Sequence, residues 1–494
     1  MYTKIDVIST AENDAREAVL RDRKLYSKFF HAAEKFAAES GLIVTGIQGR
    51  RMLCGDAELN VNECQYEFYS KRGFQQAIEL ANIVYAIDPE GLSHYTTLNT
   101  NVPHQMWTLM VNERPLFTIS ALGSYQGQKI SSLITPTNKR ATLAHLLDSV
   151  PECTGTTVHS AGSSSSLPVL KCISYELALI KLYQDICDPT QLADLADLLG
   201  SECSLRMKFL EGLNPKRDKT KVSCSKVEQI LLQKLLKFAE GPGRVVIGQR
   251  ALEMAMSNLS ANLSTNLSAN LSTNLSTNLP PLQLISMEPL QNEAAEIVKI
   301  AEQLGIDIHY EIQNAYLPGD ERLKRLRIVV VPSTDRFILD IYNAAQYELI
   351  PLIGNSELSI ATPFVVMRFA LIDLWFSKVY QQTDFQSTLY LDAIAVYENI
   401  MSQITTNKSA INMLVTDEHF VGRIDDADVA LKRSINLMTQ KNKNSDKQRF
   451  FPPYYPAQKH GGSISDEIYQ DIKRDLKSEA VGEIVDMFGE AVEI

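Results

Sequence analysis

The sequence predicts an α+β protein built as two tandem halves from an internal duplication, each half a small mixed sheet flanked by helices. Two observations predict this class. Residues 35–46 (KFAAESGLIVTG) and 237–248 (KFAEGPGRVVIG) are identical, without a gap, at six of twelve positions. Similar helical and extended segments then follow both copies in the same order, and a repeated order of elements indicates a duplicated unit.

The elements of the first half follow from the spacing of apolar residues. Recurrence at three and four positions predicts helices, and alternation or short apolar runs predict strands. Glycine and Asp-Pro pairs end several of them. The predicted order is helix 14–40, strand 42–46, a helix from 48, strand 65–70, helix 74–86, a hairpin of 106–111 and 116–122 with its turn at 112–115, and helix 174–186.

The second half repeats this order after a basic, polar joint at 214–226. A run of Asn-Leu-Ser followed by Ala or Thr occupies 258–279 and predicts a flexible loop, because these polar residues compete with the helical backbone. The predicted domains are 1–213, 214–405 with the loop at 258–281, and a helical and aromatic tail at 406–494. In this tail we expect Phe450–Pro456 to dock on the body and an acidic amphipathic helix to cover 465–488.

The composition disfavours several classes of function. The 494 residues carry a formal net charge of -11, which argues against a uniformly basic coat for nucleic acid, although a local basic groove is compatible with it. Seven cysteines without a CxxC pair predict reduced thiols and disfavour a zinc site. The polar N-terminus predicts no signal peptide, and the apolar stretch near 361–375 is too short and too polar for a membrane span.

Several segments carry a resemblance to a known family. They are LIVTG…RRML, QYEFYSKRGFQQAIELANIVY, the hairpin near 107–122, DIYNAAQYELIP and the terminal YYP. Through them most of the chain resembles the poly(A) polymerase catalytic subunits of large cytoplasmic DNA viruses, of the mimivirus and asfarvirus type, with a nucleotidyltransferase β fold. The resemblance implies twin nucleotidyltransferase-like halves, ATP as substrate, Mg²⁺ or Mn²⁺, an RNA 3′ end as partner, and a homodimer. It also implies the host cytoplasm, in the viral factory or the virion.

The resemblance also implies a site. In the family a glycine turn at a helix N-terminus holds the triphosphate. The next strand gives two carboxylates on one face and a later strand a third, and together they hold two metal ions. The residues that match the nucleotide-binding places are Gly46, Gly49 and Ser70. The catalytic places of the strand hold Gln65 and Glu67, with Glu67 as the metal ligand, and the third place falls near Ser120. In the second half Leu282 and Gln283 replace the carboxylates and Asp340 fits the third place.

Neither half therefore has the full set of carboxylates. Asp56 and Glu58 form an Asp-x-Glu pair behind the glycine turn and are surrogate metal ligands, unless they simply face water. The glycines themselves have an alternative reading, which is tight packing of strand against helix.

Four cationic residues of the joint are candidates for contacts with RNA phosphates; the alternative is that they only keep a loop soluble. They are Lys216, Arg217, Lys219 and Lys221.

Three functions remain open at this point. The first is an active poly(A) polymerase that adds AMP from ATP to viral mRNA 3′ ends by two-metal phosphoryl transfer. The second is a catalytically inactive paralogue that binds RNA or dimerises in a polyadenylation complex, beside an active polymerase or a cap-methyltransferase-like partner. The third is an interaction scaffold that keeps only the fold.

Overall fold

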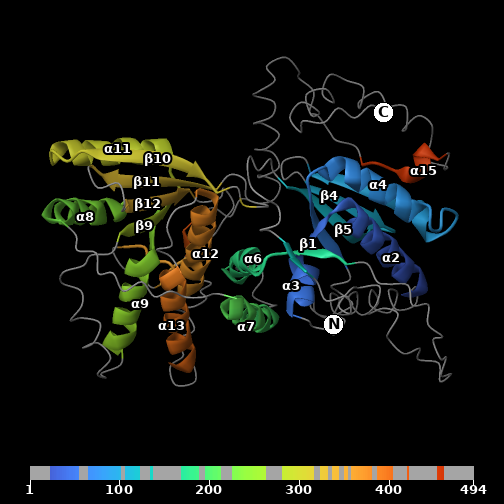
Figure 1. Ribbon diagram of the computed structural model, residues 1–494, viewed down its shortest axis with the longest axis horizontal. Helices are drawn as coiled ribbons and strands as arrows, with labels where there is room; N and C mark the ends of the chain where they lie inside the picture. Colours follow the sequence, from blue (N-terminus) through green and yellow to red (C-terminus); the bar gives the residue numbers. More distant parts are fainter. Residues whose placement is uncertain are drawn as a thin grey trace, which may run out of the picture. The chain divides into compact units, whose positions relative to one another are not determined.

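A computed structural model describes sixteen segments of the chain, and its contacts divide the chain into two compact units (Figure 1). Unit 1 is Met1–Ala178 with Arg433–Ile494, and unit 2 is Leu179–Lys432. The described residues are 23–54, 65–101, 106–122, 134–136, 169–187, 195–212, 225–262, 281–315, 317, 323–331, 337–343, 350–353, 358–380, 387–403, 420–421 and 453–460. None of the helices in these segments combines the length and the hydropathy that a membrane span requires.

Both units combine a mixed sheet with flanking helices, which confirms the predicted α+β class. In unit 1 the strand order is β3-β4-β5-β2-β1-β7-β6. The pairs β1–β7 and β2–β5 are parallel and the other neighbours are antiparallel. The elements are α2 (Arg23–Ser40), β1 (Ile43–Thr45), α3 (Gly46–Cys54), β2 (Tyr66–Ser70), α4 (Gly73–Tyr85), a 3₁₀ turn (Leu92–Tyr95), β3 (Thr96–Asn101), β4 (Met106–Val111), β5 (Arg114–Ala121), β6 (Ile134–Pro136), β7 (Lys171–Ile173) and α6 (Tyr175–Cys187), in which the chain passes to unit 2.

One face of the unit 1 sheet is an apolar core covered by α2 and α4, which pack together. Phe30 of α2 makes edge-on ring contacts with Tyr66 and Phe117. Along β2 buried and half-buried residues alternate, so Glu67 and Tyr69 lie on the opposite face. The sheet therefore has one closed apolar face and one partly open face.

The β4–β5 hairpin is tighter than predicted. Its strands extend to Val111 and from Arg114, so only Asn112 and Glu113 form the turn, both with positive φ (50° and 63°). Two residues at positive φ match the twist of the flanking strands. Pro115, which was expected in the turn, lies in β5 beside a register shift of the ladder, where the missing N–H is tolerated.

The described part of the aromatic segment, residues 453–456, docks on unit 1, as predicted. Tyr454 exchanges two backbone hydrogen bonds with Leu98 of the edge strand β3, at 2.8 and 2.9 Å. Its hydroxyl donates to Asn82 of α4 at 2.7 Å. The short helix α15 (Pro456–Lys459) follows, and His460 stacks on Tyr85 with ring centroids 5.3 Å apart. The acidic helix expected at 465–488 lies outside the described residues.

Unit 2 has a five-stranded sheet in the order β10-β11-β12-β9-β8, in which only β9–β12 is parallel. Helices α8 and α11 pack together along it, while α9, α12 and α13 form a second group (Figure 1). The elements are α7 (Leu195–Gly212), α8 (Lys226–Ala239), β8 (Arg244–Ile247), α9 (Gly248–Asn262), β9 (Leu282–Ser286), α11 (Leu290–Gln303), β10 (Ile308–Asn314), β11 (Lys324–Val330), β12 (Phe337–Asn343), β13 (Ile350–Pro351), α12 (Pro363–Tyr380), α13 (Ser387–Gln403) and β14 (Phe420–Val421).

Helix α12 covers the face of the unit 2 sheet that carries Tyr342. Its Phe369 and Phe376 contact the ring of Tyr342 at centroid distances of 5.1 and 6.1 Å. The helix is buried from Pro363 to Ser377, as expected for a helix that is apolar all round.

The low-complexity run was predicted to be a loop from residue 258. Instead α9, which begins at Gly248, extends to Asn262 and includes the first repeat of the run. Residues 263–280 lie outside the described part of the chain.

The two sheets share a strand pattern over five strands. The order β3-β4-β5-β2-β1 in unit 1 matches β10-β11-β12-β9-β8 in unit 2, with the same relative directions. Gly46 begins the helix that follows β1, and Gly248 begins the helix that follows β8. Their φ angles are 64° and 70°. This correspondence lets each position of one unit be compared with its counterpart in the other.

Candidate functional site

The corner of unit 1 where β1 meets α3 brings Gly46 and Glu67 together. Thr45, the last residue of β1, pairs with Glu67 of β2. The Glu67 carboxylate lies so close to Gly46 that a Cβ there would be 2.9 Å from Oε2 and nearer still to Oε1. Gly46 also has a positive φ, which favours glycine. A carboxylate thus lies beside the first residue of a helix, where the macrodipole favours negative charge.

Two threonine hydroxyl groups lie on the strands next to this corner. Thr118 of β5 pairs with Glu67, and its Oγ1 lies 3.3 Å from Oγ1 of Thr108 on β4. Ser120, the expected neighbourhood of the third carboxylate, pairs with Tyr69 instead, one pleat further along. The place beside Glu67 on the third strand is therefore occupied by threonine.

Ser70 lies apart from this corner, because it is on the opposite, buried face of β2. Its hydroxyl donates to Gln76 and accepts the Arg72 N–H at 2.9 Å. Gln76 in turn donates to the Ser40 carbonyl at 3.2 Å. These hydrogen bonds join β2, α4 and the end of α2, so Ser70 stabilises the packing of these three elements.

The other expected site residues divide into two groups. Gly49 lies in α3, where a Cβ would be 3.2 Å from the Val44 carbonyl oxygen, so this glycine allows close packing of helix on strand. Gln65 lies half-buried immediately before β2. Six expected residues are outside the described segments: Asp56, Glu58, Lys216, Arg217, Lys219 and Lys221.

This corner does not fit a two-metal centre as far as the described residues go. The three carboxylate places of the resembled family hold Gln65, Glu67 and Thr118, and only Glu67 carries a negative charge. Divalent cations such as Mg²⁺ are usually held by at least one or two carboxylates together with substrate phosphates, and a metal pair needs more. Across the described segments, no group of three or more His, Cys, Asp or Glu residues is placed to hold a metal ion.

Gly46→Ala is expected to destabilise unit 1 by more than Gly41→Ala. Both glycines have positive φ (64° and 71°), so each alanine costs about 1–2 kcal/mol of unfolding free energy. At Gly41 the nearest atom to an added Cβ is Lys171 Nζ at 3.8 Å, whereas at Gly46 the Cβ would displace Glu67. Urea denaturation of both variants checks this. Equal losses would contradict close packing of Glu67 on Gly46.

The counterpart corner of unit 2 has the same backbone and different chemistry. Gln283 pairs with Asp340 as Glu67 pairs with Thr118, and a Cβ at Gly248 would be 3.0 Å from Gln283 Cδ. By this register Pro281, not Leu282, corresponds to Gln65, since Leu282 precedes Gln283 directly and points to the other face of the strand. The three places of unit 2 therefore hold Pro281, Gln283 and Asp340.

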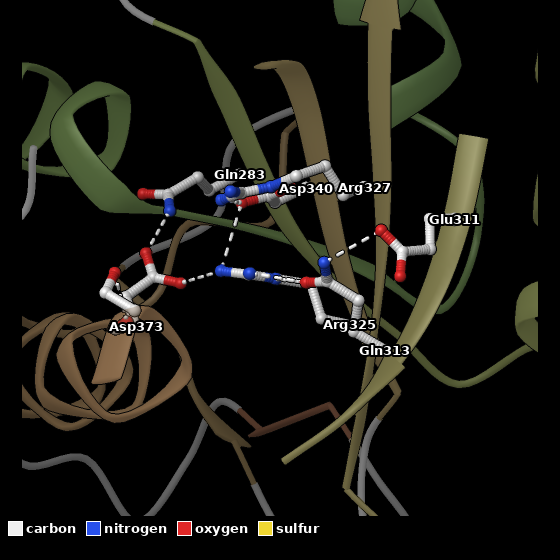
Figure 2. Close-up of polar contacts among 8 residues, drawn as sticks. Gln283, Glu311, Gln313, Arg325, Arg327, Asp340 and Asp373 are labelled. Carbon is white, nitrogen blue, oxygen red and sulfur yellow. Dashed lines mark hydrogen bonds and ion pairs between the residues drawn. The ribbon is translucent and has the colours of Figure 1, made fainter. Parts of the chain in front are cut away.

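Asp340 is fully buried and bound to arginine (Figure 2). Arg327 of β11 donates to it from Nε at 2.9 Å and from Nη2 at 2.6 Å. The Nη1 atom of Arg325 lies 3.7 Å from its Oδ2. In unit 1 the counterparts of this arginine–aspartate pair are Thr108 and Thr118.

Arg325 joins the sheet to α12 (Figure 2). Its Nη1 donates to Asp373 Oδ1 at 3.0 Å and its Nε to Gln313 Oε1 at 3.1 Å. Gln283 donates to the other Asp373 oxygen at 2.6 Å. Arg325 has no exposed surface, and its guanidinium lies 4.2 Å from the centroid of the Phe376 ring. Buried charges of this kind are tolerated because each has partners.

Burial raises the pKa of Asp373 from its usual 3.8 to about 6. The neighbouring Arg325 opposes this rise, the Asp340 carboxylate adds to it, and Arg327 and the Gln283 hydrogen bond oppose it. The loss of water around the carboxylate outweighs the attraction of the arginines.

Sequence reasoning missed most of this cluster. Asp340 and Gln283 were expected near the second corner, whereas Arg325, Arg327 and Asp373 were not. A signal was present, because Asp373 stands alone in the apolar run ALIDLWF, and an isolated charge in a buried helix needs a buried partner.

Comparison with known proteins gives relatives whose own function is undescribed and a structural neighbour with a named one. An uncharacterized protein of African swine fever virus, from South African and Namibian isolates, is 26% identical over 470 residues, covering 92% of this chain and 98% of that protein. The crystal structure of the Megavirus polyadenylate synthase superposes with a TM-score of 0.59 and 14% identity, over 96% of this chain and 87% of that one. No family model matches the sequence. The chain thus has the fold of a viral polyadenylate synthase.

Proposed function

We propose that this chain is a nucleotidyltransferase-fold subunit of a viral mRNA polyadenylation machinery that binds RNA and does not itself transfer AMP by a two-metal route. The observation that carries the proposal is the chemistry of the two corresponding corners. One has Gln65, Glu67 and Thr118, and the other has Pro281, Gln283 and Asp340. Each retains a single carboxylate, and that of unit 2 is neutralised by arginine.

The fold supports a role in polyadenylation, but it does not by itself support catalysis of AMP transfer. The chain superposes over nearly its whole length on a viral polyadenylate synthase, and its relatives of similar length are also viral. A fold alone does not establish catalysis, which depends on the groups at the site. An active polymerase chain is therefore the partner that this proposal expects.

We also propose that the two units arose by duplication of one ancestral unit. The common strand order, the helix-starting glycines at positive φ and the sequence identity of 35–46 with 237–248 support this. A further similarity is local: Ser70 accepts the Arg72 N–H and Ser286 accepts the Glu288 N–H, two residues on in both cases. Duplication explains how a second corner could lose all but one of its carboxylates while the backbone persisted.

For RNA, we propose the basic joint as the contact, through Lys216, Arg217, Lys219 and Lys221. Their charges stand against a net charge of -11 for the whole chain, so a local contact is required for binding to a polyanion.

A second candidate function, an active poly(A) polymerase, is favoured by one observation. Gly46 begins α3 beside the Glu67 carboxylate, and these are the residues that the resemblance assigns to the nucleotide turn and to a metal ligand. In that case Glu67 needs further ligands from outside the described segments, and Asp56 and Glu58 are the candidates.

Primer extension separates the two functions. Purified full-length chain is incubated with an oligo(A) RNA, ATP and either Mg²⁺ or Mn²⁺, and RNA binding is measured in parallel by fluorescence anisotropy. Glu67→Gln is the matched variant, because glutamine is the residue at the corresponding place of unit 2. We expect no extension with either metal, and RNA binding that is unchanged in Glu67→Gln.

The same binding measurement tests the basic joint. Replacing its four cations by glutamine is expected to weaken RNA binding by about tenfold or more at low salt and to flatten the salt dependence. Extension that Glu67→Gln abolishes would overturn the proposal and establish the polymerase. Extension that survives Glu67→Gln would direct the search to Asp56, Glu58 or Asp340.

A further inference from the structure

Strand β10 forms an open edge of the unit 2 sheet. It is the first strand in the order β10-β11-β12-β9-β8, and no strand or bridge of the described segments pairs with its outer side. Val331 donates its N–H to the Asp307 carbonyl at 3.0 Å, and in an antiparallel pair alternate residues bond to the neighbouring strand. The backbone N–H and C=O groups of Ile308, Tyr310 and Ile312 therefore point outward, away from β11.

The open part of this edge ends at Asn314. The hydroxyl of Tyr380 on α12 accepts the Asn314 N–H at 2.8 Å and donates to the Asn314 carbonyl at 2.9 Å. This side chain occupies the place that a neighbouring strand would take. The outward backbone groups that lack such a cover are therefore those of the run 308–312, which we call the open edge.

The corresponding edge of unit 1 is paired. By the ladder registers, Leu98 of β3 stands where Tyr310 stands on β10. Leu98 exchanges two backbone hydrogen bonds with Tyr454 and is 0% exposed, whereas Tyr310 is 47% exposed. The same position of the fold thus binds an extended segment in unit 1 and is bare in unit 2.

The sequence of the open edge, IHYEI, is complementary to itself in the antiparallel direction. If two copies pair about a two-fold axis at Tyr310, each isoleucine lies opposite an isoleucine and each His309 lies opposite a Glu311. The three middle residues are exposed and both isoleucines are half-buried. Another extended chain would match this alternation of apolar and polar pairs only by coincidence, so the sequence favours a second copy as the partner.

The polar pairs of this arrangement have suitable geometry. The outward backbone groups of Tyr310 would bond to those of its copy, so His309 and Glu311 form the flanking pairs without backbone bonds, in which side chains lie closer. Glu311 accepts one hydrogen bond from Gln313 at 3.0 Å through Oε2. A carboxylate accepts several hydrogen bonds, so an imidazole N–H of the copy can be added at Oε1.

We propose that two copies of this chain associate through the open edges of β10, antiparallel and about a two-fold axis at Tyr310, so that their five-stranded sheets become one continuous sheet. Pairing also protects the edge from other extended chains. A strand pair alone covers less than the area of about 1,600 Å² of a standard interface, so monomer and dimer interconvert with concentration. This inference is independent of the proposed function, since it concerns neither RNA nor AMP transfer.

The first test uses the unsubstituted full-length chain. Sedimentation velocity over a concentration series from micromolar to millimolar is expected to show a shift from monomer to dimer. Hydrogen exchange, followed by mass spectrometry at both ends of the series, is expected to show added protection of amides in 308–312 at high concentration. Only amides that gain a partner in the dimer are protected in this way.

Charge exchange identifies the partner as a second copy. Glu311→Lys places a lysine opposite His309, and His309→Glu places two carboxylates opposite each other. Each variant alone is therefore expected to dimerise about tenfold or more weakly. In an equimolar mixture the two variants form His–Glu and Glu–Lys pairs, and association is expected to return. Circular dichroism of each variant checks that it is folded, because Arg327 pairs with Glu311 on β11.

Tyr310→Pro removes the central outward N–H without removing a bond to β11, since proline is tolerated on an edge strand when its nitrogen faces outward. It is expected to weaken the dimer by about tenfold or more. Met207→Ser is the control, because Met207 is also an exposed apolar residue of unit 2 and lies on α7. This control is expected to dimerise as the unsubstituted chain does.

Three outcomes would overturn the proposal. The first is a chain that stays monomeric over the whole series. The second is a dimer that forms without added protection of 308–312, which would place the interface elsewhere and needs no variant to detect. The third is a mixture of folded Glu311→Lys and His309→Glu chains that associates no better than either alone.

Discussion

Asp340→Ala is expected to lower the free energy of unfolding of unit 2 by about 3–5 kcal/mol, because it leaves a buried arginine without its carboxylate. Arg327 would lose both of its hydrogen bonds to Asp340, and Arg325 would lose one of its two anionic neighbours. Since Asp340 is fully buried, water cannot take its place without opening the core. The effect is one of charge compensation rather than of side-chain volume.

The measurement can be confined to unit 2. The chain has two tryptophans, Trp107 in unit 1 and Trp375 in α12. In a Trp107→Phe background, the fluorescence of the buried Trp375 reports urea unfolding of unit 2 alone.

Unit 1 supplies the control for this prediction. Arg327→Thr combined with Asp340→Thr installs the threonine pair that Thr108 and Thr118 form, and removes one charge of each sign. We expect this double variant to be less destabilised than Asp340→Ala, although it deletes more atoms. A double variant that loses more stability than Asp340→Ala would show that volume, not unpaired charge, dominates.

The second large effect is a dependence of stability on pH that arises from Asp373. Its pKa is raised in the folded chain, to about 6 from 3.8, so the folded state takes up a proton before the unfolded state does. Its stabilising contribution is therefore complete below about pH 3.8 and is lost as the pH rises through about 6. A difference of this size corresponds to about 3 kcal/mol.

Asp373→Asn isolates this contribution, because asparagine does not titrate. Urea unfolding of both chains is followed through Trp375 between pH 4.5 and 7.5, a range set by the raised pKa of about 6. The stability of the unsubstituted chain relative to Asp373→Asn is expected to increase as the pH falls. The opposite slope would mean that Arg325, at 3.0 Å, holds the Asp373 pKa down despite burial.

The elements of this fold were largely predictable from local patterns. The glycines that end β1 and β8, the alternation of β2, and the repeated order of elements all follow from short-range rules about φ and side-chain periodicity. Gly46 and Glu67 were expected at one corner, and the strand pairing places them there. The hairpin turn was predicted two residues too long. Asparagine is often found at positive φ, as at Asn112, but glutamate is not, so the positive φ of Glu113 is not evident from its residue type.

The contacts that decide the chemistry depended on pairing between distant strands. Whether Thr118 or Ser120 lies beside Glu67 is set by the register of β2 with β5, and a shift of a single residue would change the face. Arg325 and Asp373 are 48 residues apart and meet only because α12 packs on that face of the sheet. No local pattern specifies such a meeting, which is a property of tertiary packing.

The hydrogen bonds between Tyr454 and Leu98 have a consequence for synthesis on the ribosome. Unit 1 is discontinuous in sequence, since its edge strand is paired with a segment that emerges only after all of unit 2. Unit 2 is continuous and can complete its core first. A nascent chain must therefore hold the first half with an unpaired edge until residue 454 is translated, a period in which such an edge is open to pairing with other chains.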